Sequence, residues 1–108
     1  MNRQIERADW LAFADEFSQA NRRRPFTLEM VSATLGDETI MEGAPFMALD
    51  FDPEGEGTLM FSAGEGENLT THAVTAPQEI WLETDAEEIG TALAVVIPDG
   101  KVVLRFDE

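Results

Sequence analysis

The sequence predicts an α+β fold in which one N-terminal amphipathic helix packs on a curved antiparallel β-sheet of six or seven strands. Apolar residues recur at helical spacing only near the N-terminus, and apolar and polar residues alternate from residue 26 onward. Turns of glycine, proline and acidic residues separate the alternating runs. A helix that covers one face of such a sheet gives a meander or a partly open barrel.

The helix is predicted over about residues 8–21. Asp9 lies in the first turn, where a negative charge suits the helix dipole, and three arginines follow the last turn, where cations are favourable. Pro25 then ends the helical segment. One face is apolar, with residues at positions i, i+3, i+4 and i+7: Trp10, Phe13, Ala14 and Phe17.

Alternation predicts the sheet from about residue 26 to residue 106. Gly43-Ala44-Pro45 is expected to interrupt it, and Pro98-Asp99-Gly100 fits a type I turn with glycine in the left-handed position, which predicts a C-terminal hairpin. We expect one domain over residues 1–108 with six or seven strands. These strands are drawn from eight alternating runs, at residues 26–30, 39–42, 47–51, 59–63, 69–75, 79–84, 93–97 and 102–106.

The charge is strongly acidic and unevenly distributed. The chain has 22 Asp and Glu against 7 Lys and Arg, a formal net charge of −15, and almost all of the excess falls on residues 25–108. Phosphate binding needs clustered cations, so we expect no nucleic acid as a direct partner. Lys101 is the only lysine. So few lysines among so many carboxylates indicate a surface like that of proteins from salt-loving cytoplasms.

The residue inventory excludes several kinds of chemistry. There is no cysteine, no tyrosine and only one histidine, so the chain has no thiolate metal site, disulfide, cysteine nucleophile or histidine-rich metal site. We expect no cofactor. The N-terminus lacks the apolar run of a secretory signal, and no stretch has the roughly 18 apolar residues of a membrane span. The sequence therefore predicts a cytoplasmic protein that does not enter a membrane.

The acidic loop Asp50-Phe51-Asp52-Pro53-Glu54-Gly55 has the oxygen and glycine spacing with which a calcium loop begins. The place of the closing bidentate glutamate is taken by Phe61, and the flanking residues are predicted strands rather than helices. We therefore interpret the segment as a hairpin loop whose carboxylates face water, and we expect no metal there.

Five residues are candidates for binding. Trp81 alternates out of the apolar face of its strand, so it lies either under a cover or in a binding patch. Arg22, Arg23 and Arg24 form the only basic cluster. It either caps the helix and pairs with the protein's own carboxylates, or it docks an acidic surface or a phosphate group. His72 could shuttle a proton, although a lone strand histidine is typical of a half-buried structural side chain.

This inventory favours a small domain that acts by binding or assembly rather than by catalysis, with an unknown protein or a second copy of the chain as partner. No serine lies in a Gly-x-Ser-x-Gly motif, and we assign no catalytic residue. The alternative is an enzyme or ligand-binding protein that uses carboxylates and His72 in the concavity of the curved sheet.

The N-terminus has the pattern Ile5-x-Arg7-x-x-Trp10-x-x-Phe13-x-x-x-Phe17-Ser18. This pattern resembles that of a small bacterial and archaeal family catalogued as a domain of unknown function. The turn Asp99-Gly100 and the closing Leu104-Arg105-Phe106 match the same family, so the resemblance covers nearly the whole chain. The shared positions are packing and turn residues. The resemblance implies a compact domain and brings no catalytic residue, cofactor or partner.

Overall fold

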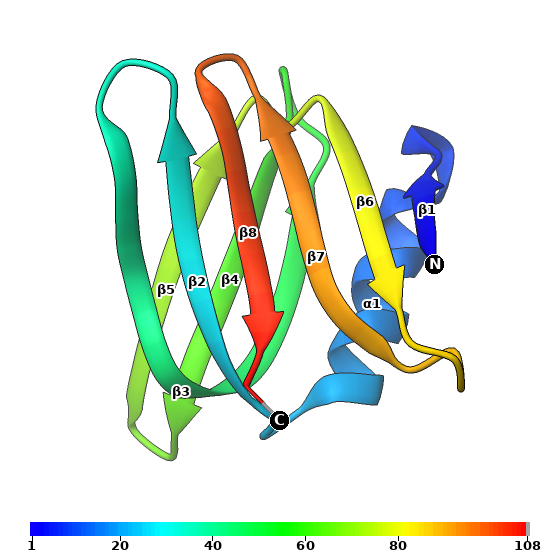
Figure 1. Ribbon diagram of the computed structural model, residues 1–108, viewed down its shortest axis with the longest axis vertical. Coiled ribbons are helices and arrows are strands. Elements are labelled where there is room, and N and C mark those ends of the chain that lie inside the picture. The colour runs from blue at the N-terminus through cyan, green and yellow to red at the C-terminus, as the bar shows by residue number, and fades with distance from the viewer. Residues whose placement is uncertain (108) are drawn as a thin grey trace.

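The computed structural model describes residues 1–107 and shows one antiparallel sheet with a single α-helix at its open side (Figure 1). The expected α+β class, with a helix packed on an antiparallel sheet, is confirmed. The elements in chain order are β1 (Asn2–Ile5), the 3₁₀ helix η1 (Arg7–Asp9), α1 (Trp10–Asn21), β2 (Pro25–Ser32), β3 (Gly36–Asp52), β4 (Thr58–Glu65), β5 (Asn68–Thr75), β6 (Glu79–Thr84), β7 (Gly90–Ile97) and β8 (Gly100–Phe106).

The described residues form eight strands, in the order β1-β6-β7-β8-β2-β3-β4-β5, so the expectation of six or seven strands is wrong. The unexpected strand is β1, which pairs with β6 and buries only Ile5. Four residues with one buried side chain carry no periodic signal, so pairing with a strand far away in the sequence decides their conformation.

The expected interruption at Gly43-Ala44-Pro45 is also wrong, because β3 runs through it for 17 residues. Gly43 has a φ of 66°, which a glycine adopts without strain and which bends the strand. The first part of β3 pairs with β2, and the part from Phe46 onward pairs with β4. The bend therefore carries the chain from the front layer into the rear layer, where β4 and β5 pass behind β2 and β8 (Figure 1).

Ser18 of α1 supplies the hydrogen bonds that a neighbouring strand would otherwise give to Leu49 in the second half of β3. Its Oγ lies 2.8 Å from the Leu49 nitrogen, whose N–H it accepts, and 3.0 Å from the Leu49 carbonyl oxygen, to which it donates. The carbonyl oxygen of Ala14 also lies 2.8 Å from this hydroxyl. Ser18 is only 4% exposed, so one hydroxyl satisfies backbone polar groups in a buried part of the structure.

The core lies between the two layers and the helix. The predicted apolar face of α1 is confirmed, since all four of its residues are buried. Phe17 meets Phe46 edge to face with ring centroids 5.5 Å apart, and Phe46 meets Phe26 in the same way at 5.6 Å. Trp10 donates from its indole nitrogen to the Ile5 carbonyl oxygen at 2.9 Å. This bond fixes β1 against the start of the helix.

The predicted C-terminal hairpin is present between β7 and β8. Gly100 has a φ of 150°, and a Cβ at this position would collide with the carbonyl oxygen of Val31 on the neighbouring β2. Glycine is therefore required by both conformation and close approach. The carboxylate of Asp99 accepts hydrogen bonds from the hydroxyls of Ser32 and Thr34, which ties this turn to the β2–β3 turn. No helix among the described residues is long and apolar enough to cross a membrane.

Candidate functional site

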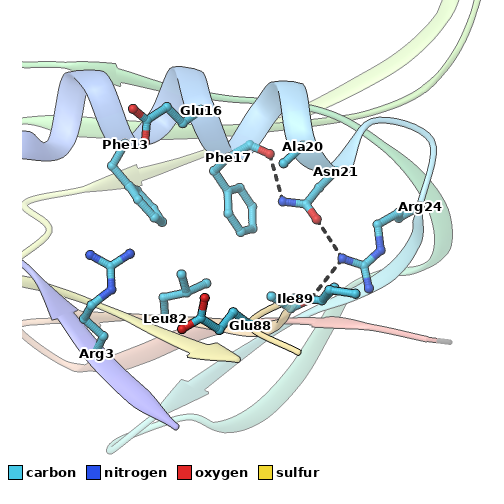
Figure 2. Close-up of a pocket in the computed structure, with 11 residues that line it drawn as sticks. Arg3, Phe13, Glu16, Phe17, Ala20, Asn21, Arg24, Leu82, Glu88 and Ile89 are labelled. Atoms are coloured by element: carbon cyan, nitrogen blue, oxygen red, sulfur yellow. Dashed lines mark hydrogen bonds between the residues drawn. The ribbon is translucent and has the colours of Figure 1, made fainter. Parts of the chain in front are cut away.

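One concave site is a groove between α1 and the β6–β7 region, with a volume of about 510 Å³ (Figure 2). Phe13 and Phe17 of the helix form one wall, and Leu82 of β6 lies opposite them. Ile89 in the β6–β7 turn is 49% exposed at the mouth. Pockets of this size with aromatic and aliphatic walls are the usual sites of small-molecule binding. The remaining lining residues are Arg3, Glu16, Ala20, Asn21, Arg24, Glu88 and Gly90.

Arg24 closes one end of the groove as a structural side chain. Its Nη1 donates to Asn21 Oδ1 at 2.7 Å and to the Gly90 carbonyl oxygen at 2.9 Å (Figure 2). Its guanidinium carbon also lies 3.9 Å from the centroid of the Phe106 ring. Asn21 in turn donates to the Phe17 carbonyl oxygen at 2.9 Å. Arg24 thus joins the end of α1 to the start of β7.

Three exposed charged residues form the rim of the groove. Arg3 projects from β1 toward the space between the helix and Leu82, while Glu16 and Glu88 come from α1 and the β6–β7 turn (Figure 2). The rim therefore carries both signs of charge around an apolar interior.

The other two arginines of the basic cluster face elsewhere. Arg22 and Arg23 are exposed, and Arg22 borders a separate depression that also includes Asp15 and Asp50. Arg23 has a φ of 71°, and its N–H bonds the Phe46 carbonyl oxygen. The three consecutive arginines therefore do not converge on one site.

Trp81 lies on the outer face of the sheet, 36% exposed, as the alternation predicts. Its indole nitrogen donates to Glu79 Oε1 at 2.9 Å. β7 pairs with β6 on one side and with β8 on the other, so β8 lies two strands from Trp81. Lys101 and Arg105 of β8 border the same shallow depression of about 170 Å³ as Trp81. Lys101 and Arg105 are the only cations after residue 24, and their approach to Trp81 had no signal in the local sequence.

His72 occupies the opposite end of the strand order, on β5. It is half-buried and pairs with Phe61, so it shares the inward face of the rear layer. Its Nε2 is buried and has no hydrogen-bond partner among the described residues. His72 does not line the groove.

The described residues contain no group of three or more potential metal ligands. In the acidic loop, Asp52 Oδ1 accepts the N–H of Glu54 at 3.0 Å, which is a turn-stabilising bond. The Ser32 hydroxyl bonds Asp99 with no histidine in the cluster, and the Ser62 hydroxyl bonds only Thr71. Neither serine has the base that activates a nucleophile.

The residues behind the N-terminal pattern hold the fold together. The Arg7 guanidinium stacks 4.5 Å from the Trp10 ring centroid. It donates to the carbonyl oxygens of Pro77 and Glu56, each at 3.1 Å. Arg7 thus fastens the N-terminal segment to the β3–β4 loop and to the connection between β5 and β6, as Ser18 fastens the helix to β3.

These features define an α+β fold with a helix-lined groove. The model of a family of unknown function, DUF5335, matches residues 1–108, and the chain belongs to this family. No curated protein and no solved structure matches the chain.

Proposed function

We propose that this domain is a non-enzymatic binding module whose groove between α1 and β6 takes a small, mainly apolar molecule. The observation that carries the proposal is the groove itself, where Phe13, Phe17 and Leu82 line a concave space of drug-like size. Two phenylalanine rings and a leucine give an apolar ligand a surface to pack against, and this contact removes apolar area of both from water.

Binding is favoured over catalysis because no histidine and no hydroxyl nucleophile lines the groove. Its polar side chains are two arginines, two glutamates and one asparagine. Arg24 and Asn21 are engaged in structural hydrogen bonds. The alternative of an enzyme that uses His72 would require a second site on the inner side of β5.

The rim argues for a ligand without a strong net charge. Arg3 would attract an anion, but Glu16 and Glu88 border the same opening, and the rest of the chain is strongly acidic. An uncharged body with at most one polar group satisfies this environment, because no rim charge is then left opposite a like charge.

The uncharged fluorescent amine N-phenyl-1-naphthylamine tests the proposal, since its emission increases in apolar surroundings. We expect saturable binding of one molecule per chain. At about 0.3 kcal/mol per non-hydrogen atom, a probe of this size gives a Kd on the order of 0.1 mM. Its sulfonated counterpart, 8-anilinonaphthalene-1-sulfonate, should bind no more tightly, because the rim has both signs of charge.

Ala20→Phe is the informative variant. Ala20 is exposed and lines the groove, so a ring at this position fills the space without disturbing the core. Gln19→Phe is the matched control, because Gln19 is the exposed neighbour on the same helix and does not line the groove. We expect Ala20→Phe to abolish probe binding and Gln19→Phe to preserve it. Equal binding by both variants, or no saturable binding by the parent, would refute the proposal.

A further inference from the structure

A second interaction surface lies at the free edge of β5. This strand is last in the sheet order and pairs only with β4. The Ala76 N–H bonds the Gly57 carbonyl oxygen at 3.1 Å, directly across the β4–β5 ladder. Hydrogen-bonded and non-bonded pairs alternate in an antiparallel ladder, so every second residue before Ala76 bonds β4. The intervening residues turn their N–H and C=O groups to the free edge, and we call them the β5 edge residues: Leu69, Thr71, Ala73 and Thr75.

The β5 edge lacks the devices that normally prevent strand addition. Its register with β4 is free of bulges, and the strand contains neither proline nor a charged side chain. Residues 68–78 are the longest uncharged run in a chain that otherwise has 22 carboxylates. Threonine and valine supply the β-branched side chains that favour extended backbone. Edge strands with these properties are templates for another strand.

Another edge of the same sheet, in the first part of β3, has features that oppose strand addition. Residues 36–44 of β3 pair with β2 on one side, and pairing with β4 begins only at Phe46. This stretch contains Asp37, Glu38 and Glu42, and its pairing with β2 has register shifts. Charge and irregularity protect the β3 edge, whereas β5 is left open. At the far end of the strand order, β1 is only four residues long.

The surroundings of β5 indicate what kind of strand would pair with it. Glu65 at the end of β4 and Glu67 in the β4–β5 turn lie at one end of β5. The Gly57 bond to Ala76 places the β3–β4 loop, with Glu54 and Glu56, at the other end. All four glutamates are exposed. A second copy added antiparallel would bring the β4–β5 turn of one chain beside the β3–β4 loop of the other at both ends. Self-pairing would therefore set carboxylates against carboxylates.

We propose that the β5 edge binds an extended segment of another protein, a segment that is uncharged in its centre and carries lysine or arginine at both ends. The backbone of the segment would complete the ladder with the β5 edge residues, as in other cases of strand addition. Its terminal cations would lie against the two acidic loops. This surface is separate from the groove, because no residue of β5 lines the groove.

Two synthetic peptides test the proposal: alternating threonine and valine with two lysines at each end, and the same centre with two glutamates at each end. We expect the lysine peptide to bind and to slow amide hydrogen exchange at the β5 edge residues. The alternate residues of β5 should be unaffected, because their amides already bond β4. The affinity should fall as potassium chloride is added, since exposed charges are screened by salt.

Ala73→Lys and Ser62→Lys form a matched pair of variants. Ala73 is an edge residue, whereas Ser62 lies on the same outer face of β4, inside the sheet, opposite Thr71. An edge lysine opposes strand addition, so we expect about tenfold weaker peptide binding in Ala73→Lys and little change in Ser62→Lys. Urea unfolding of both variants would show that they fold.

Several results would overturn the proposal. Equal binding of the glutamate peptide would remove the role of the acidic loops, and protection spread evenly over β5 would remove strand addition. A dimer that forms without peptide and protects the same four amides would make a second copy the occupant. An absence of binding by the lysine peptide would refute the inference about β5. It would not affect the proposal that the groove binds a small molecule.

Discussion

Replacing Ser18 by alanine is expected to destabilise the fold by about 2 to 4 kcal/mol, because the Leu49 N–H and C=O would both lose their partner in a buried place. Each unsatisfied buried group costs about 1 to 3 kcal/mol, and the Ser18 side chain is only 4% exposed. The Ala14 carbonyl oxygen keeps its intrahelical partner, so its bond to Ser18 adds little. The removed atom is small, and the loss therefore comes from polar satisfaction and not from packing.

Urea unfolding followed by circular dichroism measures this loss, and a thermal midpoint lower by on the order of 10 °C should accompany it. Gln19→Ala is the control, because Gln19 is exposed and bonds only Asp15 through its side chain. Amide exchange at Leu49 should accelerate in Ser18→Ala and stay slow in Gln19→Ala. A free energy of unfolding within about 0.5 kcal/mol of the parent would show that the helix does not replace a strand along β3.

Three further results are expected. Phe13→Ala should lower the free energy of unfolding by about 3 to 5 kcal/mol through lost burial and a residual cavity, and a urea curve within about 1 kcal/mol of the parent would contradict the covering-helix packing. Calorimetry with calcium should give only weak, unsaturable heat that salt abolishes, whereas saturable binding that is lost in Asp52→Ala would establish a site in the acidic loop. The thermal midpoint should rise by about 10 °C between about 0.01 and 2 M potassium chloride, because screening relieves the repulsion within a chain of net charge −15. A flat or falling midpoint would contradict the interpretation of the surface as halophile-like.

Local patterns in the sequence predicted the parts of the fold that depend on contacts between residues near one another in the chain. The spacing of Trp10, Phe13 and Phe17 predicted the buried face of α1, since a helix brings such positions to one side. Alternation predicted that Trp81 points outward, and Pro98-Asp99-Gly100 predicted the last hairpin. In each case the responsible contacts lie within a few residues, so the periodicity contains the answer.

Long-range pairing was not readable in the same way. β1 is a strand only because β6 lies beside it, and Gly43-Ala44-Pro45 stays extended because β2 and β4 hold the two halves of β3. The groove depends on the meeting of α1 with β6 and the β6–β7 turn, which are far apart along the chain. The residues that line the groove form no recognisable sequence motif, so the site could not be predicted from local sequence.

The sequence by itself determined the inward and outward faces of the helix and of most strands, the strong negative charge, and the uncharged run at residues 68–78. Only the tertiary structure decided that this run forms a free edge, that Lys101 and Arg105 border the same depression as Trp81, and that Ser18 completes the hydrogen bonding of β3. The physical reason is that side-chain periodicity depends on the local backbone, whereas the choice of strand partners depends on the packing of the whole core.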